Sequence, residues 1–491
     1  MSIVVDLNNA DFSLSSGVNL AYVNVSKVAG TYNHKVLLEL TYVDYGATSP
    51  STKTISFANS LDNSDNVLFD LTTIYETIVT PMIASAKGLD DDGFALMETI
   101  GSIHNMPNEI TATTPLFCRS NLEFSGYSSF RGNGNYLTLK FYEMNSSTAT
   151  GTPVKDASTE VVKNVFLMYG RANDDDPVQI EWTDYKLTGN TKKLLNSNYY
   201  EINGQPNIDI RLNDFHTCAF FNMCNVNQGA RPQKLVFNYF NGSTQLGQLE
   251  ALNLSGSGGG YDSDPTATGL QSTLFILHFG CGLENLQRLD MTESEYSGTK
   301  PDDVSGGRSA ITHYTMKVVQ VSTPSDLEKS KTYKFNIKNY CDRYEQTRLA
   351  FLNRFGVWEY YTFNKAKTSE LKVEKQTMDM SKFTRQPNFG SVGGFLNSAY
   401  SPDLAKQGTR ITSMNYDETF TLFTDYLEDY ELEIMKDIMM SPQIHMLEGT
   451  TAKALILDNT SMTLKGEKET GLYKYEFKFK YALPKHKSIL G

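Results

Sequence analysis

The sequence lacks any long apolar run. No stretch of about 18 apolar residues occurs, and the strongest candidate, residues 274–279, has the length of a strand. Residues 1–6 also lack the positively charged region and the long apolar stretch of a secretion signal. We therefore expect no membrane insertion, and we expect the protein to be made in the cytosol.

Cysteine is scarce. The five cysteines are Cys118, Cys218, Cys224, Cys281 and Cys341. An odd and dispersed set does not suit a disulfide framework, so we expect reduced residues in the core. His216, Cys218 and Cys224 could bind zinc if Cys281 or His278 supplied a fourth ligand. Their spacing matches no known zinc finger or ribbon and the residues between them are apolar, so we interpret them as buried core residues.

Basic residues do not outnumber acidic ones. The chain has 44 Lys and Arg against 56 Asp and Glu, which gives a net charge of −12. A negative protein repels phosphate backbones. We therefore expect no nucleic acid among its partners.

Signatures of catalysis are also missing. The sequence contains no GxSxG nucleophile turn, no phosphate-binding glycine loop and no HExxH zinc helix. No pair of carboxylates stands out by spacing or by an apolar setting. The acidic runs at residues 90–92, 174–176 and 262–264 offer oxygen ligands for calcium, but none has the spacing of an EF-hand loop. We interpret these runs as solvated loops, and we expect no enzyme, no cofactor and no metal site.

Aromatic and turn-forming residues are abundant instead. The 28 Tyr, 27 Phe and 35 Gly suit many short strands joined by turns. The clearest strand patterns lie at residues 18–25, 35–43, 136–142, 161–169, 234–240, 273–279, 313–321, 332–337, 369–376 and 410–423. The turn-rich segment 29–34 separates the first two of these runs, which predicts that they form an antiparallel pair.

Two short helices are expected among the strands. Asp70 can cap a helix that ends at Pro81, and Thr424 can cap a second helix that ends before Pro442. The apolar positions at helical spacing are Leu71, Ile74, Tyr75, Ile78 and Val79 in the first helix and Leu427, Tyr430, Ile434 and Ile438 in the second.

Length and element order predict a mainly β protein of several β-sandwich-like domains. The 491 residues suggest about three domains of roughly 150 residues each. Residues 1–114 are assigned to a small β domain with a covering helix. Residues 115–340 are assigned to a central β-sandwich region with long loop insertions, among them the Gly- and Ser-rich arm 255–265. Residues 341–491 are assigned to an α+β domain, whose strand 472–481 alternates aromatic and charged residues as if buried on one face.

Residues 347–363 form the most informative segment. Two strand-favouring runs flank Asn-Arg-Phe-Gly at 353–356, where Gly356 can take the positive φ that closes a hairpin with a bulge. Large aromatic residues lie on both faces of the second arm, so both faces must be covered. The candidate packing or subunit-interface residues are Arg348, Phe351, Trp358, Tyr360, Tyr361 and Phe363. Some of these rings could instead stack on the sugar rings of a host glycan, but we favour burial.

The same segment carries a resemblance to a known family. Residues 348–363, introduced by Tyr340 and Cys341, resemble a motif in virion structural proteins of tailed bacteriophages. Residues 55–57 and 68–81 resemble a strand, loop and short helix found early in the same proteins. The resemblance implies a structural protein of the bacteriophage virion, at the tail, baseplate or neck, and it supplies no catalytic residues.

This interpretation also implies which partners and which location are expected. We expect assembly through oligomeric β-sandwich domains, with other copies of the chain in a ring or trimer and with other tail or neck proteins. The protein would be made in the host cytoplasm and end in the virion. The alternative is a receptor-binding protein of the virion that recognises a host-surface glycan. A depolymerase of host polysaccharide is a third class, for which the sequence offers no signature.

Overall fold

The structure, a computed structural model, gives a mainly β fold. It describes residues 3–8, 12–27, 30–44, 51–79, 118–119, 134–171, 182–221, 233–252, 276–289, 291–292, 296–322, 324–338, 344–379, 383–385, 400–402, 409–425, 427, 429–448, 451–459, 465–466 and 473–482. These residues form several β-sheets, and only three short α-helices occur among them. The predicted fold class, mainly β with several sheets and few short helices, is confirmed.

Contacts along the chain define two compact units. Unit 1 comprises Met1–Cys341, Arg348–Thr362 and Leu427–Ala452, and unit 2 comprises Asp342–Thr347, Phe363–Tyr426 and Lys453–Gly491. This grouping differs from the three predicted regions, whose limits at residues 114 and 340 stay a prediction.

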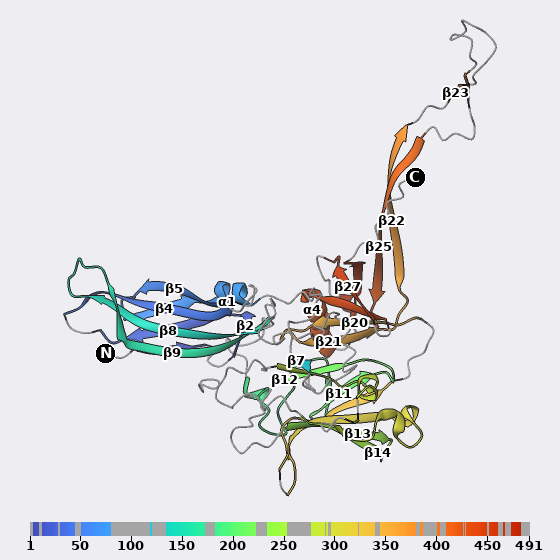
Figure 1. Cartoon of the computed structure of the whole chain (residues 1–491), viewed down its shortest axis with the longest axis horizontal. Coiled ribbons are helices and arrows are strands. Elements are labelled where there is room, and N and C mark those ends of the chain that lie inside the picture. The colour runs from blue at the N-terminus through green and yellow to red at the C-terminus, as the bar shows by residue number, and fades with distance from the viewer. Residues whose placement is uncertain are drawn as a thin grey trace. The chain divides into compact units, whose positions relative to one another are not determined.

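Unit 1 contains a sandwich of two sheets built from its first strands. One sheet has the order β1 (Ile3–Leu7), β3 (Leu20–Val25), β6 (Asn66–Asp70); the other has the order β2 (Phe12–Ser16), β9 (Val154–Arg171), β8 (Gly134–Ser146), β4 (Tyr32–Asp44), β5 (Ser51–Ser60) (Figure 1). Val23 of β3 and Leu38 of β4 belong to one buried cluster, because each strand turns its alternate apolar residues inward. The helix α1 (Thr72–Ile78) adds Tyr75 to the same core.

The predicted pairing of residues 18–25 with residues 35–43 was wrong. Strand β3 pairs with β1 and β6, whereas β4 pairs with β5 and β8. The two strands share a core across the sandwich instead of a ladder within one sheet. Alternation shows which face of a strand is buried, but it does not identify the neighbouring strand.

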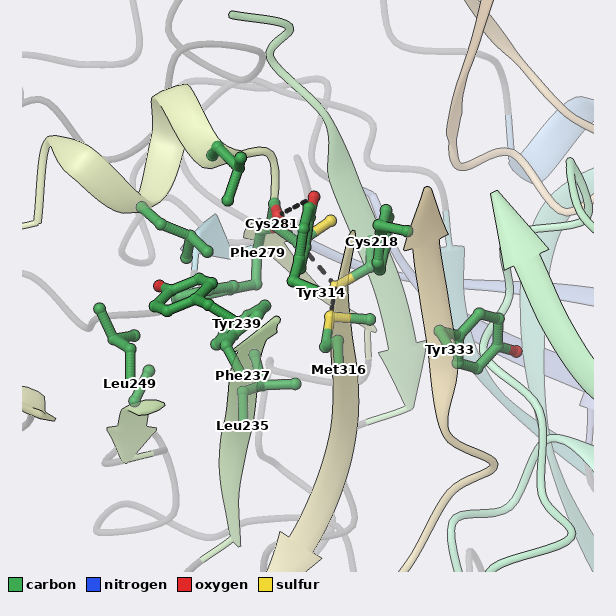
Figure 2. Close-up of a cluster of buried hydrophobic side chains, with 14 of the residues drawn as sticks. Cys218, Leu235, Phe237, Tyr239, Leu249, Phe279, Cys281, Tyr314, Met316 and Tyr333 are labelled. Carbon is green, nitrogen blue, oxygen red and sulfur yellow. Dashed lines mark hydrogen bonds between the residues drawn. The ribbon is translucent and has the colours of Figure 1, made fainter. Parts of the chain in front are cut away.

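A second sandwich follows in unit 1. Its larger sheet has the order β10 (Tyr200–Ile202), β11 (Gln205–Ile210), β19 (Tyr333–Ile337), β17 (His313–Gln320), β13 (Gln233–Asn241), β14 (Thr244–Leu252), β16 (Tyr296–Gly298), with β18 (Leu327–Glu328) on β17. Its smaller sheet has the order β12 (Thr217–Phe221), β15 (Ile276–Gly280), β7 (Cys118–Arg119). Phe237 of β13, Phe279 of β15 and Tyr314 of β17 meet in one core (Figure 2). The helix α3 (Leu283–Gln287) and the 3-10 turns Trp182–Asp184, Pro301–Asp303 and Arg308–Ala310 complete this part.

The remaining elements of unit 1 surround the aromatic hairpin. Strand β20 (Thr347–Leu352) lies between β21 (Trp358–Phe363) and β26 (Ile444–Glu448). The helix α4 (Asp429–Met440) precedes β26 and ends before Ser441, as predicted. Its start differs from the prediction, because Thr424 hydrogen-bonds Tyr475 instead of capping the helix.

Unit 2 is a sheet that ends in a long ribbon. Its strands lie in the order β27 (Thr451–Leu457), β30 (Glu476–Tyr481), β25 (Thr409–Phe423), β22 (Thr368–Asp379), and the short pairs β23 (Phe383–Arg385) with β24 (Tyr400–Pro402) and β28 (Lys465–Gly466) with β29 (Tyr473–Lys474) are also described. As predicted, β30 buries Phe477 and Phe479 on one face. It pairs with β25 only over 419–423, whereas β22 pairs with β25 over its whole length. Residues 370–379 and 409–418 thus form a two-stranded antiparallel extension, here called the ribbon (Figure 1).

Among the residues that the structure describes, none of the helices is both long and apolar enough to cross a membrane.

Candidate functional site

The hairpin that dominates the sequence forms as predicted. The backbone N–H of Asn353 donates to the carbonyl of Val357 over 2.9 Å, and the N–H of Gly356 donates back to the carbonyl of Asn353 over 2.9 Å. Gly356 has φ +70°, a conformation that glycine adopts without steric cost. The turn at 353–356 is therefore closed by the residue that the sequence assigned to it.

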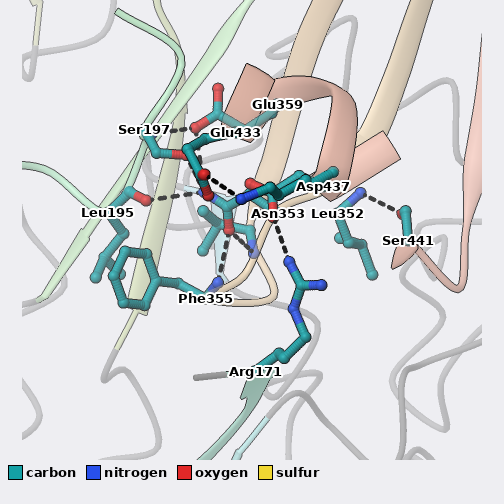
Figure 3. A network of polar contacts seen from close by, with 12 residues as sticks. Arg171, Leu195, Ser197, Leu352, Asn353, Phe355, Glu359, Glu433, Asp437 and Ser441 are labelled. Atoms are coloured by element: carbon teal, nitrogen blue, oxygen red, sulfur yellow. Dashed lines mark hydrogen bonds and ion pairs between the residues drawn. The ribbon is translucent and has the colours of Figure 1, made fainter. Parts of the chain in front are cut away.

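One side chain in this turn joins three backbone groups and the carboxylate of Glu359. The Oδ1 atom of Asn353 accepts hydrogen bonds from the N–H groups of Phe355 and Val357, over 2.9 and 3.2 Å. Its Nδ2 atom donates to the carbonyl of Leu195 over 3.0 Å and to Oε1 of Glu359 over 3.1 Å (Figure 3). Asparagine favours such bonds to nearby backbone groups, so Asn353 fixes the turn and connects it to the segment around residue 195.

The turn also inserts an aromatic ring into a buried cluster. The Phe355 ring lies 5.9 Å from Trp182 and 5.0 Å from Tyr185, measured between ring centroids. The same cluster contains Phe12 of β2 and Phe221 of β12. Burying a large aromatic residue contributes about 2–3 kcal/mol, so the Phe355 ring holds the turn against both sandwiches of unit 1.

Two glycines allow the turn to approach the end of β9. The backbone N–H of Arg171 donates to the carbonyl of Arg354 over 2.7 Å. A Cβ atom on Gly170 would lie 2.5 Å from the carbonyl oxygen of Arg354, and one on Gly356 would lie 2.5 Å from that of Tyr169. Any larger residue at either position would separate the two backbones.

A carboxylate lies buried beside the turn. The Oε1 atom of Glu359 accepts hydrogen bonds from the backbone N–H groups of Ser197 and of Asn198, the latter over 3.4 Å. Its Oε2 atom is buried and has no hydrogen-bond partner among the described residues. Burial raises the pKa of Glu359 to about 7, although the donated hydrogen bonds oppose this shift. Glu359 therefore changes protonation near neutral pH.

A part-buried ion pair lies on the other side of the turn. Nη2 of Arg171 contacts Oδ1 of Asp437 over 2.9 Å, and Asp437 belongs to α4 (Figure 3). Burial raises the pKa of Asp437 to about 6, while the charges of Arg171 and Arg354 act in the opposite direction. These residues line a small cavity of about 170 Å³ together with Tyr169. Asn353, Phe355, Gly170, Glu359 and the Arg171–Asp437 pair are together called the turn hub.

The six residues predicted for packing or an interface are mostly inside. Phe351, Trp358, Tyr360 and Phe363 are all buried, and Tyr361 is half-buried. The Trp358 ring lies 4.8 Å from His445, and the Tyr360 hydroxyl lies 2.8 Å from that of Thr217. The rings of Trp358 and Tyr360 are therefore packed inside the protein.

Arg348 is a packing residue with several partners. Its guanidinium lies 3.0 Å from the Asp214 carboxylate, donates to the carbonyl of Phe215 over 2.9 Å and lies over the Tyr360 ring. It also approaches Nδ1 of His216 to 3.3 Å. Burial lowers the pKa of His216 well below its usual value, and the Arg348 charge acts in the same direction. A neutral His216 is therefore expected at physiological pH.

Two of the zinc candidates, Cys218 and Cys281, lie in an apolar core. Cys218 and Cys281 are buried free thiols, and the Cys218 sulfur lies 3.7 Å from the Met316 sulfur (Figure 2). Burial raises the pKa of Cys281 well above its usual value, so its thiol stays protonated. Within the described residues no group of three His, Cys, Asp or Glu side chains is placed to hold a metal ion. Cys224, the acidic runs at 90–92, 174–176 and 262–264, and the arm 255–265 lie outside those residues.

Most residues of the turn hub were not predicted from the sequence. Asn353 carried a signal, because asparagine in a turn before glycine often bonds the backbone. Glu359 carried another, as a charged residue between the aromatic residues of a strand that must be covered on both faces. Gly170 and the pair of Arg171 with Asp437 had no local signal, since their partners are far along the chain.

The arrangement joins distant elements of unit 1 to one another. The sheets and the turn hub define a mainly β protein in which polar side chains connect several sheets from inside. No protein-family model and no curated protein matches this sequence.

Proposed function

We propose that the protein is a structural subunit of a tailed-bacteriophage virion, at the tail, baseplate or neck. Its function is assembly: it binds copies of itself and neighbouring virion proteins, and it is not an enzyme. The protein reaches the particle after synthesis in the host cytoplasm. The proposal rests on the resemblance of residues 348–363, 55–57 and 68–81 to such proteins and on one structural observation, the ribbon of unit 2.

Strand β22 of the ribbon is exposed along its whole length in this chain. All twelve residues of β22 are exposed, including Leu371, Val373 and Met378, and Ile411 of β25 is exposed as well. A two-stranded ribbon is marginally stable in water by itself, because it buries little apolar area. Its retention in a protein is most simply explained by a partner that covers it, which favours an assembly function.

The turn hub supports the same function from inside unit 1. A subunit that transmits force must keep its sheets in a fixed arrangement, and Asn353 and Phe355 connect segments more than a hundred residues apart. The buried carboxylates of Glu359 and Asp437 contact protein groups, as expected for structural networks. Most soluble oligomers are homo-oligomers with closed symmetry, which suits a subunit whose sheets keep a fixed arrangement.

Recognition of a host glycan by the hairpin is less favoured. Stacking of a sugar needs an exposed aromatic face, whereas Trp358 and Tyr360 are each only 2% exposed. A glycan site elsewhere would need another aromatic surface.

Localisation in the particle tests the proposal. Antibodies raised against the purified chain are bound to virions released by the host that carries the gene, and gold label is located by electron microscopy. The expected result is gold label at the tail, baseplate or neck, at the same place in each particle. Virions that carry no label and no peptide of the chain by mass spectrometry would overturn the proposal.

A further inference from the structure

Strand β22 is the last strand of its sheet among the described strands. It is long and exposed, and its register against β25 shifts once, between Gln376 and Thr377. Such an edge presents backbone N–H and C=O groups along one side, which makes it a template for another strand. Proteins often protect edges with lysine, and β22 contains Lys372 and Lys375. Here, however, each lysine is accompanied by a glutamate on the same strand.

We infer that the edge of β22 pairs antiparallel with the same edge of a second copy of the chain, about a twofold axis at Val373. This inference rests on the proposed function, because it names the partner of the ribbon. The partner is a second copy because the charge pattern of β22 complements itself.

The charge pattern selects the register. In a twofold antiparallel pair, residues on the same face lie opposite each other, so the axis must pass through a residue position. With the axis at Val373, Lys372 lies opposite Glu374 of the second copy, and the same contact occurs twice. Glu370 then lies opposite Gln376, and Leu371 lies against the aliphatic stem of Lys375. In this register no like charges oppose each other between residues 369 and 377.

Neighbouring registers place like charges opposite each other, which is unfavourable. An axis at Lys372 sets two lysines against each other and Glu370 against Glu374, and an axis at Glu374 sets two glutamates against each other. An axis at Leu371 brings Lys375 opposite Lys367. Within one chain Lys372 and Glu374 lie 2.9 Å apart in an exposed ion pair. The proposed pairing replaces this contact within each chain by the same contact between the two copies.

Charge exchange tests the pairing on the full chain. Glu374→Lys should weaken association about tenfold or more, because it places a lysine opposite Lys372 at both symmetric contacts. The double variant Lys372→Glu with Glu374→Lys should restore it, since the complementarity is reversed in both copies. Lys436→Glu changes another exposed ion pair, that of Lys436 with Glu433 on α4, and serves as the control. Association is measured by light scattering and sedimentation over a range of protein concentration.

Crosslinking tests the axis itself. Val373→Cys places two thiols directly opposite each other, so an added oxidant such as diamide, which takes up two electrons and two protons, should form a disulfide-linked dimer. Met378→Cys would place the thiols roughly 30 Å apart and should not crosslink, nor should the unmodified chain. Equal crosslinking at both positions, or none at position 373, would overturn the twofold axis.

The outcomes separate this inference from the proposed function. If the chain is found in virions and forms oligomers that neither charge variant alters, the pairing is wrong and the structural function stands. If the charge variants act as expected on a protein that virions do not contain, the pairing stands and the virion function is wrong. A chain that remains monomeric at all concentrations overturns the pairing, and gold labelling still decides the virion function.

Discussion

At the scale of single residues, Glu359 couples the stability of unit 1 to pH. Its pKa is about 7 in the folded protein against an ordinary value of 4.5, because burial disfavours the charged form. Between these values the folded state binds the proton more tightly than the unfolded state. Stability is therefore highest at the acidic end of this window and falls as pH rises through 7. Asp437, with a pKa of about 6, acts in the same direction.

Replacing Glu359 by Gln should remove most of this fall. Glutamine keeps the oxygen that accepts from Ser197 and Asn198, and it carries no charge to desolvate. Relative to the unmodified protein, Glu359→Gln should gain on the order of 3 kcal/mol of unfolding free energy between pH 4.5 and pH 8. Denaturant unfolding at a series of pH values measures the difference.

Glu76→Gln is the matched control, because Glu76 is exposed on α1. It should leave the pH profile unchanged. A Glu359→Gln profile parallel to that of the unmodified protein would show that Glu359 is already ionised in the folded state.

Gly356 and Gly204 show two different reasons why a position requires glycine: a positive φ, and a close approach of another backbone. Both have positive φ, +70° and +77°, but a Cβ atom on Gly204 meets nothing within 4 Å while one on Gly356 meets the Tyr169 carbonyl at 2.5 Å. Gly204→Ala should therefore cost about 1 kcal/mol for the backbone conformation alone. Gly356→Ala should cost about 3 kcal/mol, because the turn must also move away from β9. Equal losses of unfolding free energy would mean that the close approach of the two backbones is not needed.

At the scale of elements, local sequence was sufficient where the determining contacts are local. The hairpin of β20 and β21 follows from Gly356 and its flanking strands, and the burial of Phe477 and Phe479 follows from simple alternation. The strands that pair with β3 and with β4 could not be predicted, because the same alternation of apolar and polar residues fits any neighbouring strand. Exposure of both faces of β22 also had no signature, since its mixture of Leu, Val, Lys and Glu is that of a half-buried strand.

Thr424 shows how a local signal can have a distant partner. Its hydroxyl accepts a hydrogen bond from the N–H of Tyr475 over 2.9 Å, and the N–H of Thr424 donates to the Tyr475 carbonyl over 3.0 Å. Threonine before a run of helical periodicity resembles a helix cap, yet α4 begins only at Asp429. The partner of Thr424 is Tyr475, 51 positions away, and nothing in the local sequence pattern indicates this contact.

This bridge gives a prediction for unit 2. Thr424→Val keeps the shape of the side chain but leaves the buried N–H of Tyr475 without its acceptor, which should cost about 1–3 kcal/mol of unfolding free energy. Thr421→Val, at a half-buried position on β25, should change stability by less than about 0.5 kcal/mol. Amide hydrogen exchange at Tyr475 should accelerate only in the Thr424 variant. Unchanged protection there would contradict the bridge.

At the scale of the whole molecule, the chain passes between its two compact units five times. Each unit is therefore built from three separate segments of the chain. Hydrophobic patterns reveal elements in chain order, whereas membership of a unit depends on contacts between distant segments.

The ribbon can be removed without removing the rest of unit 2. Glu370 and Thr419 are paired in register, so Asn-Gly in place of residues 371–418 should close β22 and β25 with a tight turn. This variant should fold, keep its unfolding free energy within about 1 kcal/mol and remain monomeric by light scattering, because the deleted residues of β22 are exposed and contribute little core. A second variant replaces only residues 380–408 by Asn-Gly, between the paired Asp379 and Thr409, and it retains the ribbon. If the ribbon is the assembly element, the second variant forms the same oligomers as the full chain while the first does not. Oligomers of unchanged mass in both variants would move the assembly surface to another part of the molecule.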